Sequence, residues 1–222
     1  MRTVFATALV AAGLSAAASA QTFDDTATVN ALIEIESLDA IDLVVERHLD
    51  YGTFGYILTT QGTDGYYGWT STDVSLTKSG TTFTCTNPAA DALAVTIRPN
   101  ATTPTTGFLT ASGTANRSAL IAMSLTNGTL INPDEPVMCS NTGTNCGANR
   151  RVPVRAFGFH LYGGSGVGST STILTPLTNS PHATSFDDDG QLAMCFFGEA
   201  TLSTDLVDTS YLAQISVTVA YD

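Results

Sequence analysis

The sequence predicts an all-β protein, a β-sandwich of antiparallel strands. In residues 211–222 every second side chain is apolar, and residues 26–36 show the same alternation. Because successive side chains of a strand point to opposite faces, each segment is predicted to be a long strand with one buried face. Between them, short apolar runs alternate with Gly, Pro and Asn turns, and helical periodicity is nearly absent. The prediction therefore extends to the whole chain.

The two long strands present regular apolar faces. That of residues 26–36 consists of Ala27, Val29, Ala31, Ile33 and Ile35, and that of residues 211–222 consists of Tyr211, Ala213, Ile215, Val217, Val219 and Tyr221. Their β-branched content favours strands over helices. Each face must pack against something, and what covers it is the central question about function.

Shorter elements are predicted between the two long strands. Strands are expected at residues 73–77, 81–85, 93–98, 118–125, 152–162 and 191–203, and long loops at 127–149 and 163–190. Residues 37–45 fit either a helical turn or a bend into another strand, and both alternatives stay open. Gly52 and Gly55 interrupt an aromatic-rich strand at residues 48–58, and glycines within a strand often mark a bulge or a close backbone approach.

The first 20 residues are predicted to be a secretory signal peptide. Arg2 supplies the positive charge, residues 4–14 the apolar core and residues 18–20 the small-residue cleavage site. No later run approaches the roughly 20 apolar residues that a membrane helix needs. Residues 21–222 are therefore predicted to be a single exported domain without a membrane-spanning segment.

The acidic composition narrows the range of partners. The chain has a formal net charge of −12 at pH 7, and Lys78 is its only lysine. Such a surface repels phosphate backbones, which argues against a nucleic-acid partner.

Four cysteines, Cys85, Cys139, Cys146 and Cys195, indicate disulfides in an exported protein. Four cysteines allow three pairings. Cys139 and Cys146 bound a short turn-rich loop that could close on itself, which favours this pair and leaves Cys85 with Cys195. A zinc site is the competing interpretation, but CxxC spacing and a neighbouring histidine are lacking.

The candidate chemical groups are scattered along the chain. The histidines His48, His160 and His182 lie far apart and lack metal-ligand spacing. The GGSGVGS run at residues 163–169 lacks the Lys-Ser/Thr ending of a phosphate-binding loop. No catalytic constellation, cofactor or metal is predicted, so the chain is not expected to be an enzyme.

Other groups have both a functional and a simpler interpretation. The three aspartates at residues 187–189 could hold calcium, or form a solvated turn. The aromatic turn at residues 66–69 could be a sugar platform. Glu34 and Glu36 share a strand face and could divide acid and base roles, or form its wet side.

Three segments resemble bacterial pilin domains. LDYGTF at residues 49–54 is similar to the Leu-x-Phe-Gly motif that follows the first strand of such domains. TFTCTNPAADALAVTI at residues 82–97 is similar to their cysteine-bearing strand. Residues 197–222 resemble their ending, a Val/Thr-rich strand with a penultimate aromatic side chain. The spore-coat-U-like subunits of archaic chaperone–usher pili, with related fimbrial-type domains, are the family that the chain most resembles.

This resemblance implies an immunoglobulin-like β-sandwich that lacks one strand. In such pilins a periplasmic chaperone fills the resulting groove, and the N-terminal segment of the next subunit later replaces it by strand addition. Residues 26–36 have the spacing of such a donor, and residues 211–222 would border the groove. The implied protein is a structural or adhesive fimbrial subunit, passing through the periplasm to the cell surface or exterior.

Two alternatives stay open. Residues 26–36 could be the first strand of the chain's own sheet, because little linker separates them from the next strand candidates. The chain could also be a self-contained secreted binding module that does not polymerise, with ligand loops at residues 66–69 or 187–189.

Overall fold

The computed structural model describes residues 21–22, 31–32, 40–60, 63–99, 102–127, 129–132, 135–140, 147, 150–164, 172–174, 181–206 and 210–222. This part of the chain contains no α-helix, and thus none that could cross a membrane. All of its strand pairs are antiparallel, so the predicted all-β fold is confirmed.

The strands are numbered in chain order. They are β1 (Gln21–Thr22), β2 (Ala31–Leu32), β3 (Asp42–Arg47), β4 (Phe54–Leu58), β5 (Gly65–Gly68), β6 (Leu76–Ser79), β7 (Thr82–Cys85), β8 (Asp91–Leu93), β9 (Val95–Pro99), β10 (Gly107–Ser112), β11 (Ser118–Asn127), β12 (Thr129–Asn132), β13 (Glu135–Ser140), β14 (Arg151–Tyr162), β15 (Thr172–Leu174), β16 (His182–Ser185), β17 (Gln191–Leu202), β18 (Tyr211–Leu212) and β19 (Gln214–Tyr221).

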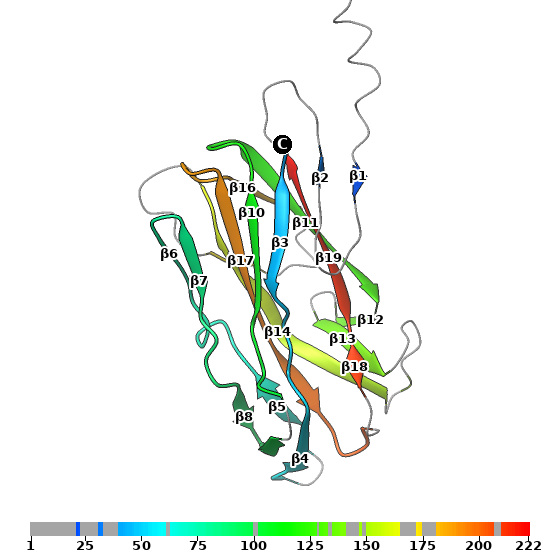
Figure 1. Ribbon diagram of the computed structural model, residues 1–222. Coiled ribbons are helices and arrows are strands. Elements are labelled where there is room, and N and C mark those ends of the chain that lie inside the picture. The colour runs from blue at the N-terminus through cyan, green and yellow to red at the C-terminus, as the bar shows by residue number, and fades with distance from the viewer. Residues whose placement is uncertain are drawn as a thin grey trace, which may run out of the picture.

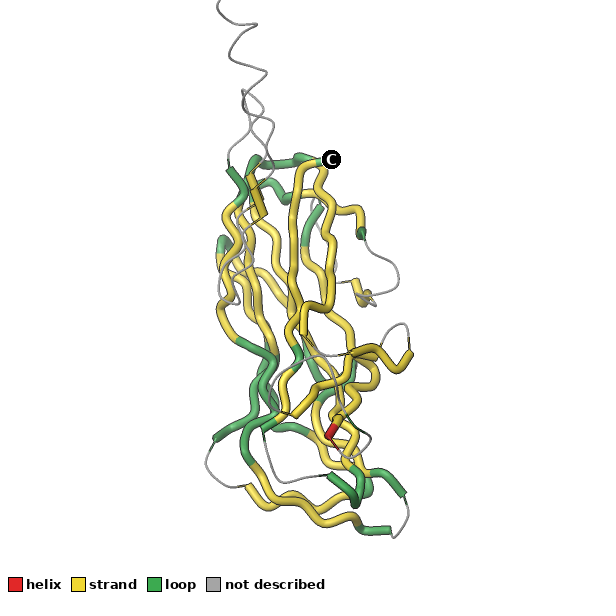
Figure 2. The backbone as a smooth tube through the Cα atoms, turned by 90° about the vertical axis from the view of Figure 1, so that its right-hand side faces the viewer, coloured by secondary structure: helices red, strands yellow, loops and turns green. Residues whose placement is uncertain are grey.

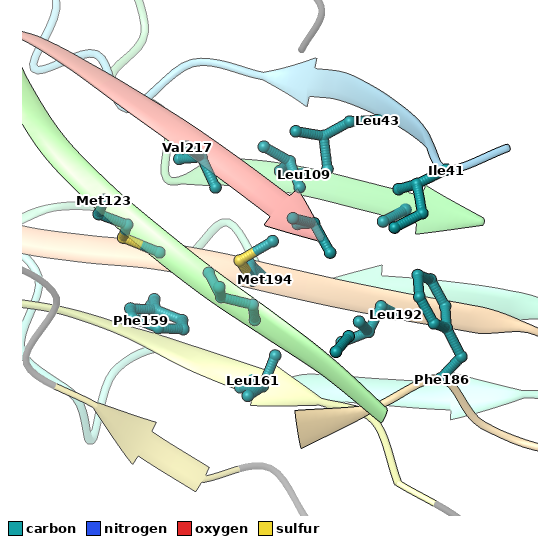
Figure 3. Close-up of a cluster of buried hydrophobic side chains, with 14 of the residues drawn as sticks. Ile41, Leu43, Leu109, Met123, Phe159, Leu161, Phe186, Leu192, Met194 and Val217 are labelled. Carbon is teal, nitrogen blue, oxygen red and sulfur yellow. The ribbon is translucent and has the colours of Figure 1, made fainter. Parts of the chain in front are cut away.

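Two sheets enclose the main core in a sandwich-like arrangement (Figures 1 and 2). The larger follows the order β12-β13-β14-β17-β10-β3, and the smaller follows β16-β11-β19. Side chains of β3, β10, β14 and β17 meet those of β11 and β19 between the sheets (Figure 3). Ile121, Phe159 and Val219 are fully buried there. The alternating apolar faces thus form the inner surfaces of a sandwich.

The strand at the centre of the fold is β17. It pairs with β10, β14 and β5, and most of its residues are buried, the others being partly buried. Leu192 and Met194 belong to the main core, whereas Cys195 and Phe197 belong to a second apolar cluster. Because both faces are covered, the sequence of β17 lacks the alternation of a strand with one wet face.

Short strands between residues 54 and 99 supply much of the second cluster. They form the pairs β4–β9, β5–β8 and β6–β7. The Cys85–Cys195 disulfide joins β7 to β17, with the two Cα atoms 5.6 Å apart, so this predicted pairing is confirmed. Cys139 is also disulfide-bonded. Its predicted partner, Cys146, lies outside the described residues, and the Cys139–Cys146 pair stays a prediction.

Some predicted local features change in the structure. The open question at residues 37–45 is answered for residues 42–45, which belong to strand β3, whereas residues 37–39 lie outside the described part of the chain. The regions 127–149 and 163–190, both predicted as loops, contain short strands: β12 and β13 lie in the first, and β15 and β16 in the second. A side chain at Gly52 would place its Cβ 2.7 Å from the Thr102 carbonyl oxygen, so the close approach predicted there is correct. Gly55 occupies an ordinary strand position, and the prediction there is wrong.

Candidate strand-accepting groove

The strands β3 and β19 border an opening of the sandwich. Each is the last strand in the order of its described sheet. Figure 1 shows them running in opposite directions. The edge of a sheet is where a further strand is added, because its main-chain N–H and C=O groups can extend the ladder.

The opening is a groove of about 930 Å³. One wall comes from the segment 45–56 and the other from the segment 210–217. The floor includes Leu109, Phe157, Phe196, Ala200 and Leu202. Val45, Phe196 and Ile215 pack against the main core but are only partly buried. The core therefore reaches the surface through the groove, where additional apolar side chains would complete it.

The two ends of the groove differ. At one end the sandwich is closed, because Ile41 before β3 and Tyr221 at the end of β19 are both buried in the main core. At the other end Tyr51 and Tyr56 line the groove, together with Leu212, which is 64% exposed. We call this second end the mouth.

Two tyrosines shape the mouth. The Tyr56 hydroxyl donates a hydrogen bond to the Ser203 carbonyl oxygen. The Tyr51 hydroxyl is buried and has no hydrogen-bond partner among the described residues. Burial, and secondarily the charge of Glu199, raises the pKa of Tyr51 far above its ordinary value of 10.0. Its neutral form is therefore strongly favoured in the folded protein.

Tyr51 predicts a loss of stability at alkaline pH. In the unfolded chain it ionises near pH 10.0, whereas in the folded chain it stays neutral. Its effect on the free energy of unfolding should therefore be constant below that pH, and above it stability should fall by up to about 1.4 kcal/mol per pH unit. Urea unfolding between about pH 8 and about pH 11 measures the slope. Tyr51→Phe should give a shallower slope, and equal slopes would contradict the prediction.

The groove uses only part of the predicted C-terminal face. Tyr211, Ala213, Ile215 and Val217 line it. Val219 and Tyr221 instead lie in the main core, and the Tyr221 hydroxyl accepts the Thr114 N–H at 2.6 Å. The reason is that the sandwich is closed at this end.

The predicted donor face falls mostly outside the described residues. Ala31 lies in β2, which pairs with β1 and comes close to β19 of the same chain. Ala27, Val29, Ile33 and Ile35 lie outside the described part, as do Glu34 and Glu36. Substituting Val29 and Ile33 with aspartate distinguishes a segment donated to a second copy from one that packs in its own chain.

The other predicted groups do not converge on one site. His48 is exposed, whereas His160 and His182 are buried on different strands. No group of three or more metal-ligating side chains occurs among the described residues. Residues 165–169 of the Gly-rich run lie outside them. Trp69 is fully buried, so the interpretation of its ring as a sugar platform is wrong.

The acidic turn forms an ion-pair cluster. The Nζ of Lys78 lies 2.6 Å from an Oδ2 atom of both Asp187 and Asp189. Desolvation alone would lower the pKa of Lys78, but hydrogen bonds to the two aspartates and their charges outweigh it and raise the pKa. Lys78 and the three aspartates are each conspicuous in the sequence, but their contact could not be predicted from it. Lys78 and Asp187 are 109 residues apart, and no periodic pattern links them.

One wall and the floor of the groove were not predicted. Val45, Leu49 and Phe196 resemble ordinary strand residues, and only their position at the opening distinguishes them. Comparisons with known proteins add no site residues, since no family model, curated protein or solved structure matches the chain.

Proposed function

We propose that this chain is an exported, pilin-like structural or adhesive subunit that assembles by β-strand addition. The observation that supports the proposal is the groove beside β3 and β19, in which core side chains stay partly exposed. An added strand would gain main-chain hydrogen bonds and bury alternate side chains in the groove. The Cys85–Cys195 disulfide is compatible with the oxidising compartments through which exported proteins pass.

The proposed occupant is residues 26–36 of a second copy, after a periplasmic chaperone has held the groove. The apolar side chains of this segment recur at every second position, as strand addition requires. Extended, the segment spans about 36 Å, enough to run the length of β19. Each buried Val or Ile contributes about 1.5–3 kcal/mol, so Val29 and Ile33 should dominate binding.

The direction of the donated strand follows from the short connection to its own domain. Residues 37–39 are all that separate the donor from the described chain at Ala40, next to the closed end of the groove. The acceptor is the copy whose groove receives the donor segment. If residue 36 of the donor lay at the closed end of the acceptor groove, the closed ends of the two copies would meet, and the pair would form a two-fold dimer. If it lies at the mouth, copies stack end to end as an open fibre. Fibre assembly therefore requires a donor antiparallel to β19.

A charge on the apolar face of the donor tests the proposal. Ile33→Asp and Val29→Asp place a carboxylate where an apolar pocket is expected, which is strongly unfavourable. Asn30→Asp adds the same charge on the opposite face and is the matched control. With the full chain co-expressed with a periplasmic chaperone, the wild type and Asn30→Asp should form heat-resistant polymers on gels. Ile33→Asp and Val29→Asp should fold with the chaperone but fail to polymerise.

Two other outcomes would replace the proposal. Polymers from Ile33→Asp like those of the wild type would show that the segment is not the donor. If both apolar-face variants misfold as monomers, while the wild type is a stable monomer, the segment packs in its own chain. The chain would then be the alternative, a self-contained secreted binding module.

A further inference from the structure

The only lysine of the chain is held between two carboxylates at a nearly buried position. Lys78 lies on β6, and its side chain is 9% exposed. Its Nζ is 2.6 Å from Oδ2 of Asp187, whose side chain is 7% exposed, and 2.6 Å from Oδ2 of Asp189. The Phe83 ring, 5.4 Å from the Nζ, adds an apolar surface beside the amine. A single surface ion pair would not require this degree of burial.

The surroundings of Asp187 supply the groups that amide formation needs. Its Oδ1 accepts the backbone N–H groups of Asp189 at 3.0 Å and Gln191 at 2.8 Å. These two donors would stabilise negative charge that develops on Oδ1 when a nucleophile attacks the carboxyl carbon. Asp189, whose side chain is 51% exposed, is in position to accept a proton from the amine and pass it on.

We propose that Lys78 and Asp187 condense to an intramolecular isopeptide bond, with Asp189 as the proton carrier. One ammonium proton first passes to the Asp187 carboxylate, a transfer that the raised pKa of Lys78 makes unfavourable and therefore slow. The neutral Nζ then attacks Cγ. The Nζ–Cγ bond forms, and Asp189 carries a second proton from nitrogen to Oδ2. The Cγ–Oδ2 bond then breaks and Oδ2 leaves as water, so that an amide N–H remains and no oxidant or reductant is needed.

Burial gives the reaction its direction. Holding the amine against the carboxyl group raises their effective concentration by orders of magnitude over two free groups. The low exposure of Lys78 and Asp187 restricts the return of water that hydrolysis would require. Asp187 rather than Asp189 is the carboxyl group that forms the amide, for two reasons. Water reaches Asp189 more easily, and the two backbone N–H donors point to Asp187.

The bond would tie the β6–β7 hairpin to β17 and the turn before it at a second place. The Cys85–Cys195 disulfide already joins β7 to β17. Lys78 and Asp187 are 109 residues apart, and the two cysteines are 110 apart. The same hairpin would therefore be held by two covalent links of nearly equal loop length, a construction suited to a protein under mechanical or proteolytic stress. This inference is independent of strand addition.

Mass spectrometry of the reduced, denatured full chain tests the proposal. The wild type should be lighter by one water molecule than the sequence that remains after signal-peptide cleavage, and digestion should yield a branched peptide that joins residues 78 and 187. Lys78→Arg keeps the positive charge but cannot form the amide, so it should have the full mass of its sequence. Asp189→Asn should fold, yet retain a large unreacted fraction.

Two results would overturn the proposal. A folded wild type with the full mass of its sequence would mean that Lys78 and Asp187 form an ion pair only. A loss of water that persists in Lys78→Arg would belong to another group of the chain. Since the wild-type mass decides the first point, the test does not depend on the folding of any variant.

Discussion

Replacing both Cys85 and Cys195 with alanine is expected to destabilise the protein by about 2–5 kcal/mol. The disulfide closes a loop between cysteines 110 residues apart, and Cys195 is fully buried in β17. Its loss increases the conformational freedom of the unfolded chain more than that of the folded one. Arg47 still donates hydrogen bonds to the carbonyl oxygens of Cys85 at 3.2 Å and Thr106 at 2.6 Å. The hairpin should therefore stay docked in the folded variant but open at lower denaturant concentration.

Urea unfolding under non-reducing conditions measures this difference. Thr84→Ala is the matched control, because Thr84 is exposed on the same strand, and it should change stability by less than about 0.5 kcal/mol. A double variant as stable as the wild type would mean that the bridge does not stabilise the fold. Peptide mapping that joins Cys85 to another cysteine would contradict the pairing itself.

Trp69→Ala should destabilise the protein by about 3–5 kcal/mol, the range for removing a large aromatic side chain from a core. Trp69 is fully buried, and its ring centroid lies 6.0 Å from that of Tyr51. Its indole N–H donates to the Pro88 carbonyl oxygen at 3.0 Å, so the substitution leaves a cavity and removes the partner of a carbonyl group.

Circular dichroism is the appropriate measurement, because Trp69 is the only tryptophan and its fluorescence is lost with it. Leu93→Ala is the control, since Leu93 is 59% exposed and its truncation should change stability by no more than about 0.5 kcal/mol. If Trp69→Ala and Leu93→Ala unfolded at the same urea concentration, Trp69 would not have the core role assigned to it.

Features that depend on neighbouring residues could be predicted from the sequence. The alternation in residues 211–222 predicted β19, although the predicted single strand is divided into β18, which pairs with β13, and β19, which pairs with β11. The Gly-, Pro- and Asn-rich turns predicted a fold of antiparallel strands. Both are properties of a few consecutive residues, since successive side chains of a strand point alternately to its two faces. The Cys85–Cys195 pair was also predictable, because a short loop favoured pairing the other two cysteines.

Local sequence patterns were therefore enough to predict a β-sandwich with a disulfide and with strands that have one apolar face. No local pattern predicts that β17 is covered on both faces, that Trp69 is buried or that Lys78 contacts Asp187, and these features are seen only in the folded protein. The tertiary structure also decided that the groove ends before Val219, where the sandwich closes. The reason is that burial and ion pairing depend on which distant segments become neighbours, and the chain brings residues 109 and 110 positions apart into contact without a local pattern to mark them.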